Sequence, residues 1–153
     1  MEERSPLEIG WKEYLDLPEL GIFRLKAKMD TGARTSALHV DSLTVLETLP
    51  DGTEIAEVEI GLDRRRPERR VKTRVALLGR LRVKDTGGRG EVRPWLETEL
   101  VLGSVRKRIR LTLTDRSGML FRMILARKAL EEDFVVNTSR KYLLRSWHPR
   151  KNR

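Results

Sequence analysis

Two Asp-Thr-Gly triplets, at residues 30–32 and 85–87, have the residue types and spacing that could do chemistry. Peptide hydrolysis by carboxylates needs two of them close together and sharing one proton, because like charges at that distance cannot both ionise. One carboxylate then acts as a base on a bound water, while the other protonates the developing oxyanion. An Asx turn also favours Asp followed by Thr and Gly, so a lone triplet is also typical of a tight turn.

The sequence around each triplet separates the two possibilities. Asp30 ends a stretch in which apolar and basic residues alternate, as they do in a strand with one buried face. Such a strand would fix the aspartate, Thr31 could hydrogen-bond to a neighbouring loop, and Gly32 would let backbone approach closely. The apolar positions of this strand are Phe23, Leu25, Ala27 and Met29.

Asp85 lies in the glycine-rich stretch "VKDTGGRGEV", which is typical of a hairpin tip. Residues 33–84 are too few to build a second lobe between the triplets, so a dyad within one chain is disfavoured. We therefore expect Asp85 to be a turn residue, in a hairpin over residues 80–93 whose glycines would permit the motion of a flap.

The rest of the chain predicts short strands joined by turns. Alternating runs before and after Gly103-Ser104 predict a β-hairpin, and "PDGT" at 50–53 predicts another hairpin turn. The run from 126 to 133, "ARKALEED", is the one helical pattern. The fold class expected is all-β, a small closed barrel or sandwich. The other strands are expected at 41–48, 54–61, 71–77 and 119–125, and the hairpin residues are Val92, Leu96, Leu100, Leu102, Ile109, Leu111 and Leu113.

Composition limits the class of protein. A chain of 153 residues without cysteine is the size of one domain, and it offers no disulfide, thiolate ligand or thiol nucleophile. No apolar run is long enough to span a membrane, and the N-terminus "MEERSPLEIG" is too polar for a signal peptide. We expect a single domain over residues 1–153, a cytoplasmic location and no membrane partner.

The net charge of +9 favours acidic partners. Basic residues concentrate at 63–74, "DRRRPERRVKTR", and in the C-terminal "RSWHPRKNR", where we expect a flexible tail from about residue 146. Charge runs of this kind are also typical of solvated loops and tails.

Four stretches, in order along the chain, resemble the retropepsin-like family labelled "ATP-dependent zinc protease", which is RimB-like and associated with RimK-type glutamate ligases. They are "LPELGIFRLKAKMDTGARTSALHV" (17–40), "EVRPWLETELVLG" (91–103), "LTLTDRSGMLFRMILARKAL" (111–130) and "FVVNTSRKYLL" (134–144). The resemblance implies a closed barrel of the single-lobe pepsin/retropepsin type with one short helix near the C-terminus. It also implies that Asp30 is catalytic, with Thr31, Gly32 and Ala33 supporting it. Since one lobe supplies one aspartate, the active site would require a homodimer.

Two positions depart from the retropepsin pattern. The family's second element is two hydrophobic residues followed by Gly-Arg, and here Ala126 replaces the glycine before Arg127. Viral retropepsins place an acidic residue where this chain has Arg34. If Arg34 and Arg127 both point inward they need an acid, for which Asp115 and Glu91 are candidates. Alternatively Arg34 faces the cleft and binds a substrate carboxylate, or it is a surface residue.

Neither zinc nor ATP is supported by the residues, so we expect no cofactor and no metal. His39 and His148 are far apart, and there is no HExxH motif and no GxxxxGK[ST] loop. His39 near Asp41 is half a metal site at most, and a satisfied histidine is the simpler interpretation.

The function predicted is an aspartic endopeptidase that activates water with Asp30 from two subunits, acting on peptide or protein substrates. The basic surface and the family association favour acidic peptides, such as the products of a RimK-type ligase. The alternative is a non-catalytic binding module of the same fold, which would contact ribosomal protein or RNA through its basic segments.

Overall fold

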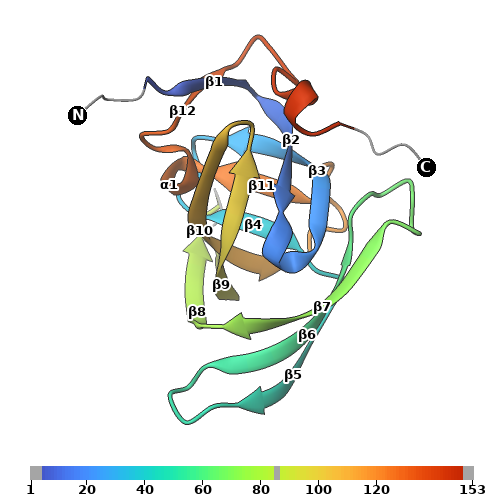
Figure 1. Ribbon diagram of the computed structural model, residues 1–153. Helices are drawn as coiled ribbons and strands as arrows, with labels where there is room; N and C mark the ends of the chain where they lie inside the picture. The colour runs from blue at the N-terminus through green and yellow to red at the C-terminus, as the bar shows by residue number, and fades with distance from the viewer. Residues whose placement is uncertain (1–4, 85–86, 150–153) are drawn as a thin grey trace.

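The computed structural model describes residues 5–84 and 87–149, and its centre is a closed β-barrel (Figure 1). Six strands form the ring in the order β10-β4-β11-β3-β2-β9, which a β9–β10 pairing closes. The ring strands are β2 (Lys12–Leu17), β3 (Ile22–Asp30), β4 (Ser36–His39), β9 (Gly90–Leu102), β10 (Val105–Thr114) and β11 (Met123–Ala126). The prediction of a small all-β barrel is confirmed.

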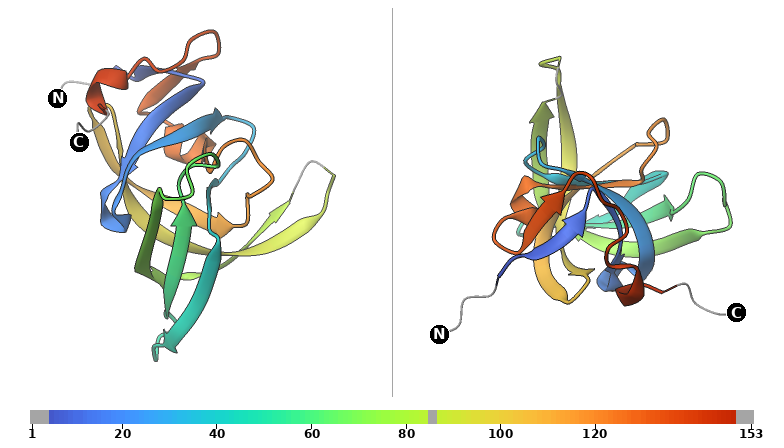
Figure 2. Two further views of the ribbon diagram at one scale, coloured as in Figure 1. Left: turned by 90° about the vertical axis from the view of Figure 1, so that its right-hand side faces the viewer. Right: turned by 90° about the horizontal axis from the view of Figure 1, so that it is seen from above.

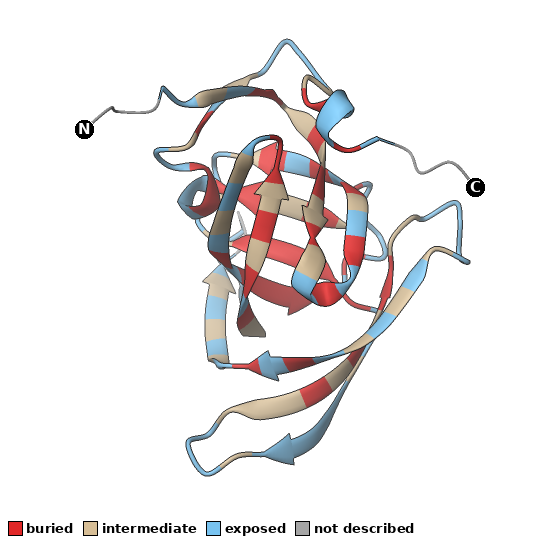
Figure 3. Ribbon diagram, viewed as in Figure 1, coloured by how far each residue is buried: buried red, intermediate tan, exposed pale blue. Residues whose placement is uncertain are grey.

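The strand that carries the first triplet follows the predicted alternation over most of its length. Leu25, Ala27 and Met29 on β3 are buried in the barrel, and the basic residues between them face outward (Figure 3). The prediction is wrong for Phe23, which is 44% exposed while Ile22 is fully buried. Arg24 has a positive φ of 57°, and this irregularity changes which side chains face inward.

The predicted hairpin around Gly103-Ser104 is confirmed. Strands β9 and β10 pair antiparallel from Leu102–Val105 to Trp95–Thr112, and Gly103 takes a left-handed φ of 59° in the turn. Val92 is 55% exposed and is not a core residue, because β9 there extends beyond the barrel to pair with β8 (Gly79–Lys84).

A separate three-stranded sheet lies beside the barrel (Figure 2). It contains β5 (Ser42–Thr48), β6 (Glu54–Gly61) and β7 (Arg70–Leu77), in that order and all antiparallel. The turn at 50–53 joins β5 to β6 as predicted, with Gly52 at a φ of 91°. Residues 119–122 are not part of a strand; β11 begins only at Met123.

The first and last strands of the described chain pair beside the barrel. β1 (Leu7–Gly10) pairs in parallel with β12 (Phe134–Asn137), and the helix α1 (Arg127–Leu130) is shorter than predicted. Two 3-10 turns, η1 (Pro18–Leu20) and η2 (Arg145–Trp147), complete the elements. None of the helices in the described ranges is long and apolar enough to cross a membrane.

One histidine connects the C-terminal segment to the barrel, and the flexibility of the tail from about residue 146 stays a prediction. His148 is buried, its Nε2 accepts a hydrogen bond from the Gly103 amide at 3.0 Å, and Nδ1 lies 3.2 Å from Asp16. His148 therefore anchors this segment to the barrel, while Ser146, Trp147 and Pro149 are exposed.

Candidate active site

Asp30 is the last residue of β3, where the chain leaves the barrel and turns. Its Oδ1 accepts hydrogen bonds from the amides of Gly32, at 3.1 Å, and Ala33, at 3.2 Å. These bonds fix the carboxylate over its own loop. Oδ2 accepts no hydrogen bond from the described residues, and the residue is only partly buried. One oxygen is thus held by the backbone and the other is available to a water or a second carboxylic acid.

The loop after Asp30 is fastened to the start of α1. The Arg127 amide donates to the Ala33 carbonyl at 2.9 Å, and the Lys128 amide donates to the Arg34 carbonyl at 3.2 Å. The element that contains Ala126 and Arg127 therefore supports the loop through backbone atoms. A substitution in this element acts on Asp30 through the loop.

Ala126 lies beside Asp30, because β11 and β3 run parallel with Ala126 opposite Asp30 in the register. The methyl group is fully buried, and the backbone is extended, with φ of −102° and ψ of 177°. The Ala126 amide donates to the hydroxyl of Ser36 at 2.9 Å. Since any residue adopts this backbone conformation, the alanine does not require the freedom of a glycine.

Thr31 and Gly32 form the exposed part of the loop. A Cβ at position 32 would lie 3.4 Å from Asp30 Oδ1, so the absence of a side chain keeps the carboxylate uncovered. The Thr31 hydroxyl makes no hydrogen bond to another described residue. The bond we expected from Thr31 to a neighbouring loop is therefore absent within the described part of one chain.

Arg34 is exposed and lines a small pocket of about 280 Å³ on the flank of the loop. The pocket also contains Arg108, Arg110 and Lys128, and it has no acidic side chain in its lining. Arg108 pairs with Glu19 at 2.8 Å, whereas Arg34 forms no ion pair within the described ranges. The pocket is therefore strongly cationic.

Neither acid expected to neutralise Arg34 and Arg127 does so. Glu91 accepts from the Thr114 hydroxyl at 2.8 Å and pairs with Arg93 at 3.1 Å. Asp115 accepts from the Ser117 amide at 2.8 Å in a local turn. That interpretation of Arg34 is wrong, and Arg127 is exposed as well.

Arg116 is a buried arginine near the site that the sequence did not single out. It is 9% exposed, and its Nε donates to the Phe121 carbonyl at 3.1 Å, which closes the loop between β10 and β11. Burial lowers the pKa of the Arg116 guanidinium, the charge of Arg93 lowers it further, and the charge of Asp30 opposes both. A buried arginine within the electrostatic reach of Asp30 could have been found only from contacts distant in sequence.

His39 is a satisfied histidine. Its Nδ1 accepts from the Arg116 amide at 2.8 Å, so the ring proton is on Nε2, which donates to Asp41 at 2.8 Å. Burial raises the pKa of Asp41, but hydrogen bonds from His39 and the Gly61 amide outweigh it, with help from the charge of Arg70, and leave that pKa below its ordinary value. Across residues 5–84 and 87–149, no cluster of three or more His, Asp or Glu side chains is arranged to hold a metal ion.

The second triplet lies at the tip of the β8–β9 hairpin in sequence. Asp85 and Thr86 lie outside the described residues, so the structure does not describe that turn. The strands that flank it, β8 and β9, form an antiparallel ladder whose outermost described pair is Lys84 and Gly90. The hairpin predicted over 80–93 therefore exists.

Comparisons with known proteins agree with this geometry. The family model described as "RimB-like: Retropepsin-like aspartic endopeptidase RimB" matches residues 8–146. The chain is 33% identical over 132 residues to a "Probable alpha-L-glutamate ligase" from Desulfotalea psychrophila, which covers 84% of this chain and 27% of that protein. A protein of the same name from Shewanella pealeana is 29% identical over 136 residues, covering 89% and 29%. This chain thus spans little more than a quarter of the length of these relatives.

The fold also occurs in a solved structure. A crystal structure of a Legionella pneumophila protein with unknown function (DUF785) superposes with a TM-score of 0.71, covering 92% of this chain and 99% of that one, at 22% identity. That likeness supports the fold alone, whereas the family match extends over both the Asp30 loop and the Ala126-Arg127 element. The chain belongs to the RimB-like family of retropepsin-like aspartic endopeptidases.

Proposed function

We propose that this protein is an aspartic endopeptidase whose active site forms when Asp30 from two copies of the chain meets across a two-fold axis. The observation that carries the proposal is the Asp30 carboxylate, which has one oxygen held by two amides and the other left open at the end of a barrel strand. A single chain supplies one such group, and hydrolysis by this mechanism needs two.

The chemistry follows from bringing the two carboxylates together. They would share one proton, so that the ionised Asp30 takes a proton from a bound water as the water attacks the peptide carbonyl. The protonated Asp30 gives its proton to the carbonyl oxygen and forms a tetrahedral diol. Collapse of the diol, with proton transfer to the amide nitrogen, releases the amine and the carboxylic acid.

The pocket beside Arg34 favours substrates with an acidic side chain near the cleaved bond. Arg34 has no ion-pair partner within the described ranges, and its guanidinium matches a carboxylate in shape and charge. Several relatives are named as glutamate ligases, and a glutamate ligase would make an acidic peptide product. We infer that acidic peptides are the substrate class and that a glutamate ligase is a functional partner.

The decisive experiment is Asp30→Asn, assayed on acidic peptides by mass spectrometry. The variant keeps the two backbone hydrogen bonds, so we expect it to fold normally and to lose hydrolysis. Asp85→Asn is the matched control and should keep activity. Loss of activity in Asp85→Asn with retention in Asp30→Asn would reverse the assignment.

The substrate class is tested separately with a peptide library that contains matched acidic and neutral segments. Arg34→Gln should reduce cleavage of the acidic members by roughly tenfold or more, since a charge-assisted pair is lost, and leave neutral members unchanged. Equal cleavage of both sets by the wild-type protein would remove the case for acidic substrates.

A further inference from the structure

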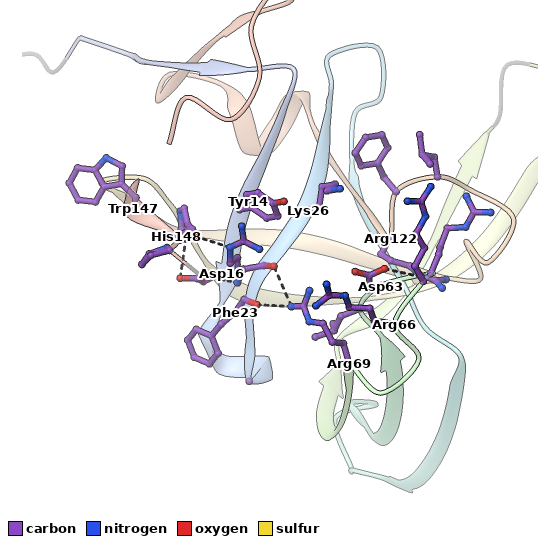
Figure 4. A pocket seen from close by; sticks show the side chains of 18 residues that line it. Tyr14, Asp16, Phe23, Lys26, Asp63, Arg66, Arg69, Arg122, Trp147 and His148 are labelled. Atoms are coloured by element: carbon purple, nitrogen blue, oxygen red, sulfur yellow. Dashed lines mark hydrogen bonds and ion pairs between the residues drawn. The ribbon is translucent and has the colours of Figure 1, made fainter. Parts of the chain in front are cut away.

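A broad basic groove of about 1180 Å³ crosses the outer face of the barrel (Figure 4). Its floor is formed by β2 and the N-terminal half of β3, and one wall is the loop between β6 and β7. The loop before β11, the end of η2 and the two residues after it complete the lining. Arg69 holds the β6–β7 loop against β3, because its Nη2 donates to the carbonyls of Phe23 and Arg24, each at 3.4 Å.

The lining has a large excess of positive charge. It contains seven Lys and Arg side chains against two acids, Asp16 and Asp63. None of the seven is in ion-pair contact with a carboxylate within the part of the chain that the structure describes. Since three of them, Arg64, Arg65 and Arg66, project from one exposed loop, the groove concentrates cations that have no internal counter-charge.

Arg122 gives a second and independent indication of a ligand. Its Nε and Nη1 are buried, and neither has a hydrogen-bond partner among the described residues. Buried N–H groups without an acceptor are costly, and an anion bound beside Arg122 would supply the missing acceptor. Arg122 lies at one end of the groove and Trp147 at the other (Figure 4).

This groove is distinct from the Asp30 loop. Its residue on β3 nearest to Asp30 in sequence is Lys26, and four residues of extended strand span about 13 Å. Phe121 and Arg122 similarly lie before the start of β11, whereas Ala126, beside Asp30, ends that strand. A ligand bound in this groove therefore does not require the proposed peptidase site.

The aromatic side chain at the end of the groove discriminates between polyanions. Trp147 is 57% exposed, whereas Tyr14 is covered by Tyr142 on one side and by the guanidinium of Arg24, 3.9 Å from its ring centre. An exposed indole beside a line of arginines suits stacking with an unpaired base while the arginines follow the phosphates. An acidic peptide would use the cations and would leave the indole unused.

We propose that this groove binds single-stranded RNA, with phosphates contacted by the β6–β7 loop and Arg122, and a base stacked on Trp147. Three measured quantities separate these roles: affinity, its dependence on salt, and its dependence on the type of polyanion. The probe is a fluorescently labelled ten-nucleotide single-stranded RNA of mixed sequence, titrated with the full chain.

The first test replaces the three loop arginines, as Arg64→Gln/Arg65→Gln/Arg66→Gln. If each neutralises one phosphate, the slope of log affinity against log salt should become less negative by about 2, and affinity at low salt should fall by roughly tenfold or more. The matched control removes the same charge elsewhere, as Lys72→Gln/Arg74→Gln/Arg106→Gln on β7 and β10. An equal loss in the control would overturn the groove as the site.

The second test replaces the stacking residue. Trp147→Ala should weaken binding by about tenfold and leave the salt slope unchanged, because stacking carries no charge. Both variants are first checked for wild-type thermal unfolding. A Trp147→Ala protein that binds RNA as tightly as wild type would overturn the stacking assignment.

The third test compares the RNA with an acidic peptide as ligands. A ten-residue oligoglutamate peptide is titrated under the same conditions against the Asp30→Asn protein, which should not cleave it, and it should bind more weakly than the RNA and be insensitive to Trp147→Ala. If the peptide binds the groove and the RNA does not, the site is one for acidic peptides and the RNA proposal fails. Asp30→Asn should bind RNA like wild type, so failure of the peptidase and failure of the RNA site are distinguishable.

Discussion

At the scale of single residues, two carboxylates of this protein show what separates a structural acid from one with an oxygen left open. Glu13 is fully buried and accepts three amides, from Gly10 at 2.7 Å, Leu143 at 2.9 Å and Leu144 at 3.0 Å. Both of its oxygens are occupied. Asp30 accepts two amides on one oxygen and keeps the other open. Only the second arrangement leaves an oxygen for a water or for a shared proton.

The structural acid gives a stability prediction. Glu13→Ala leaves three amides without their acceptor between β1 and the C-terminal segment, so the free energy of unfolding should fall by about 3–5 kcal/mol. Urea unfolding followed by circular dichroism measures this change. Glu47→Ala, at an exposed position on β5, should change it by less than about 0.5 kcal/mol. A Glu13→Ala protein as stable as that control would contradict the stabilising role of these three hydrogen bonds.

At the scale of elements, Asp41 joins the barrel to the three-stranded sheet. It accepts from His39 at the end of β4, from the Gly61 amide on β6 at 2.6 Å, and from Arg70 on β7 at 3.1 Å. These contacts hold the pKa of Asp41 below its ordinary value despite burial. The sheet is therefore attached partly through one ionised carboxylate.

This attachment should depend on pH. Because the pKa of Asp41 is lower in the folded state than in the unfolded state, its stabilisation is fully present above the unfolded pKa of about 3.9. It is lost as the pH falls through the lower folded value. The difference in unfolding free energy between wild type and Asp41→Asn should accordingly narrow from pH 6 towards pH 2.5. A constant difference over that range would exclude Asp41 as the titrating group.

The β9–β10 turn gives another prediction at this scale. Gly103 has a φ of 59°, and a Cβ there would lie 2.9 Å from a methyl group of Leu144. Gly103→Ala should lower the free energy of unfolding by about 1–3 kcal/mol. Gly118→Ala is the matched control, since a Cβ there meets nothing within 4 Å and the backbone does not need positive φ. Equal midpoints in urea for the two variants would contradict this account.

At the scale of the whole molecule, the net charge of +9 opposes the dimerisation that the proposed site requires. Two copies must associate to complete the proposed site, while their like charges repel. Association should therefore strengthen as salt screens the repulsion. Light scattering across protein concentration and salt measures this equilibrium. A strict monomer at all conditions that show hydrolysis would contradict the dimeric site.

Mixing subunits tests the shared site directly. When wild type and Asp30→Asn are mixed in equal amounts and allowed to exchange, only dimers with two aspartates should be active. Activity should then be about a quarter of that of the same total amount of wild type, against about half for sites within single chains. The ratio is measured by initial rates after exchange, with Asp85→Asn as the mixing control. A value of one half would refute the shared dyad.

Patterns within one strand or one hairpin carried the successful predictions. The alternation on β3, the hairpin at Gly103 and the turn at 50–53 depend on neighbours in sequence, and each is confirmed. One error has a local cause that residue types did not reveal, and the others occurred where distant parts of the chain decide burial or pairing. Phe23 is exposed because the backbone at Arg24 has a positive φ, and Val92 is exposed because β9 runs beyond the barrel. The acids proposed for Arg34 have partners of their own, Thr114 and Ser117.

The sequence by itself determined the all-β class and the place of Asp30 at a strand end, since period-two burial and turn residues are local properties of the chain. The choice of a closed barrel over a sandwich came from the family resemblance. Only the tertiary structure decided that Ala126 is accommodated beside Asp30, that Arg116 lies within reach of it, and that His148 is buried. The basic loop at 64–66 likewise becomes one wall of a groove only when the chain folds it over β3. Contacts between residues far apart in sequence have no local signature, because they depend on how the whole chain closes.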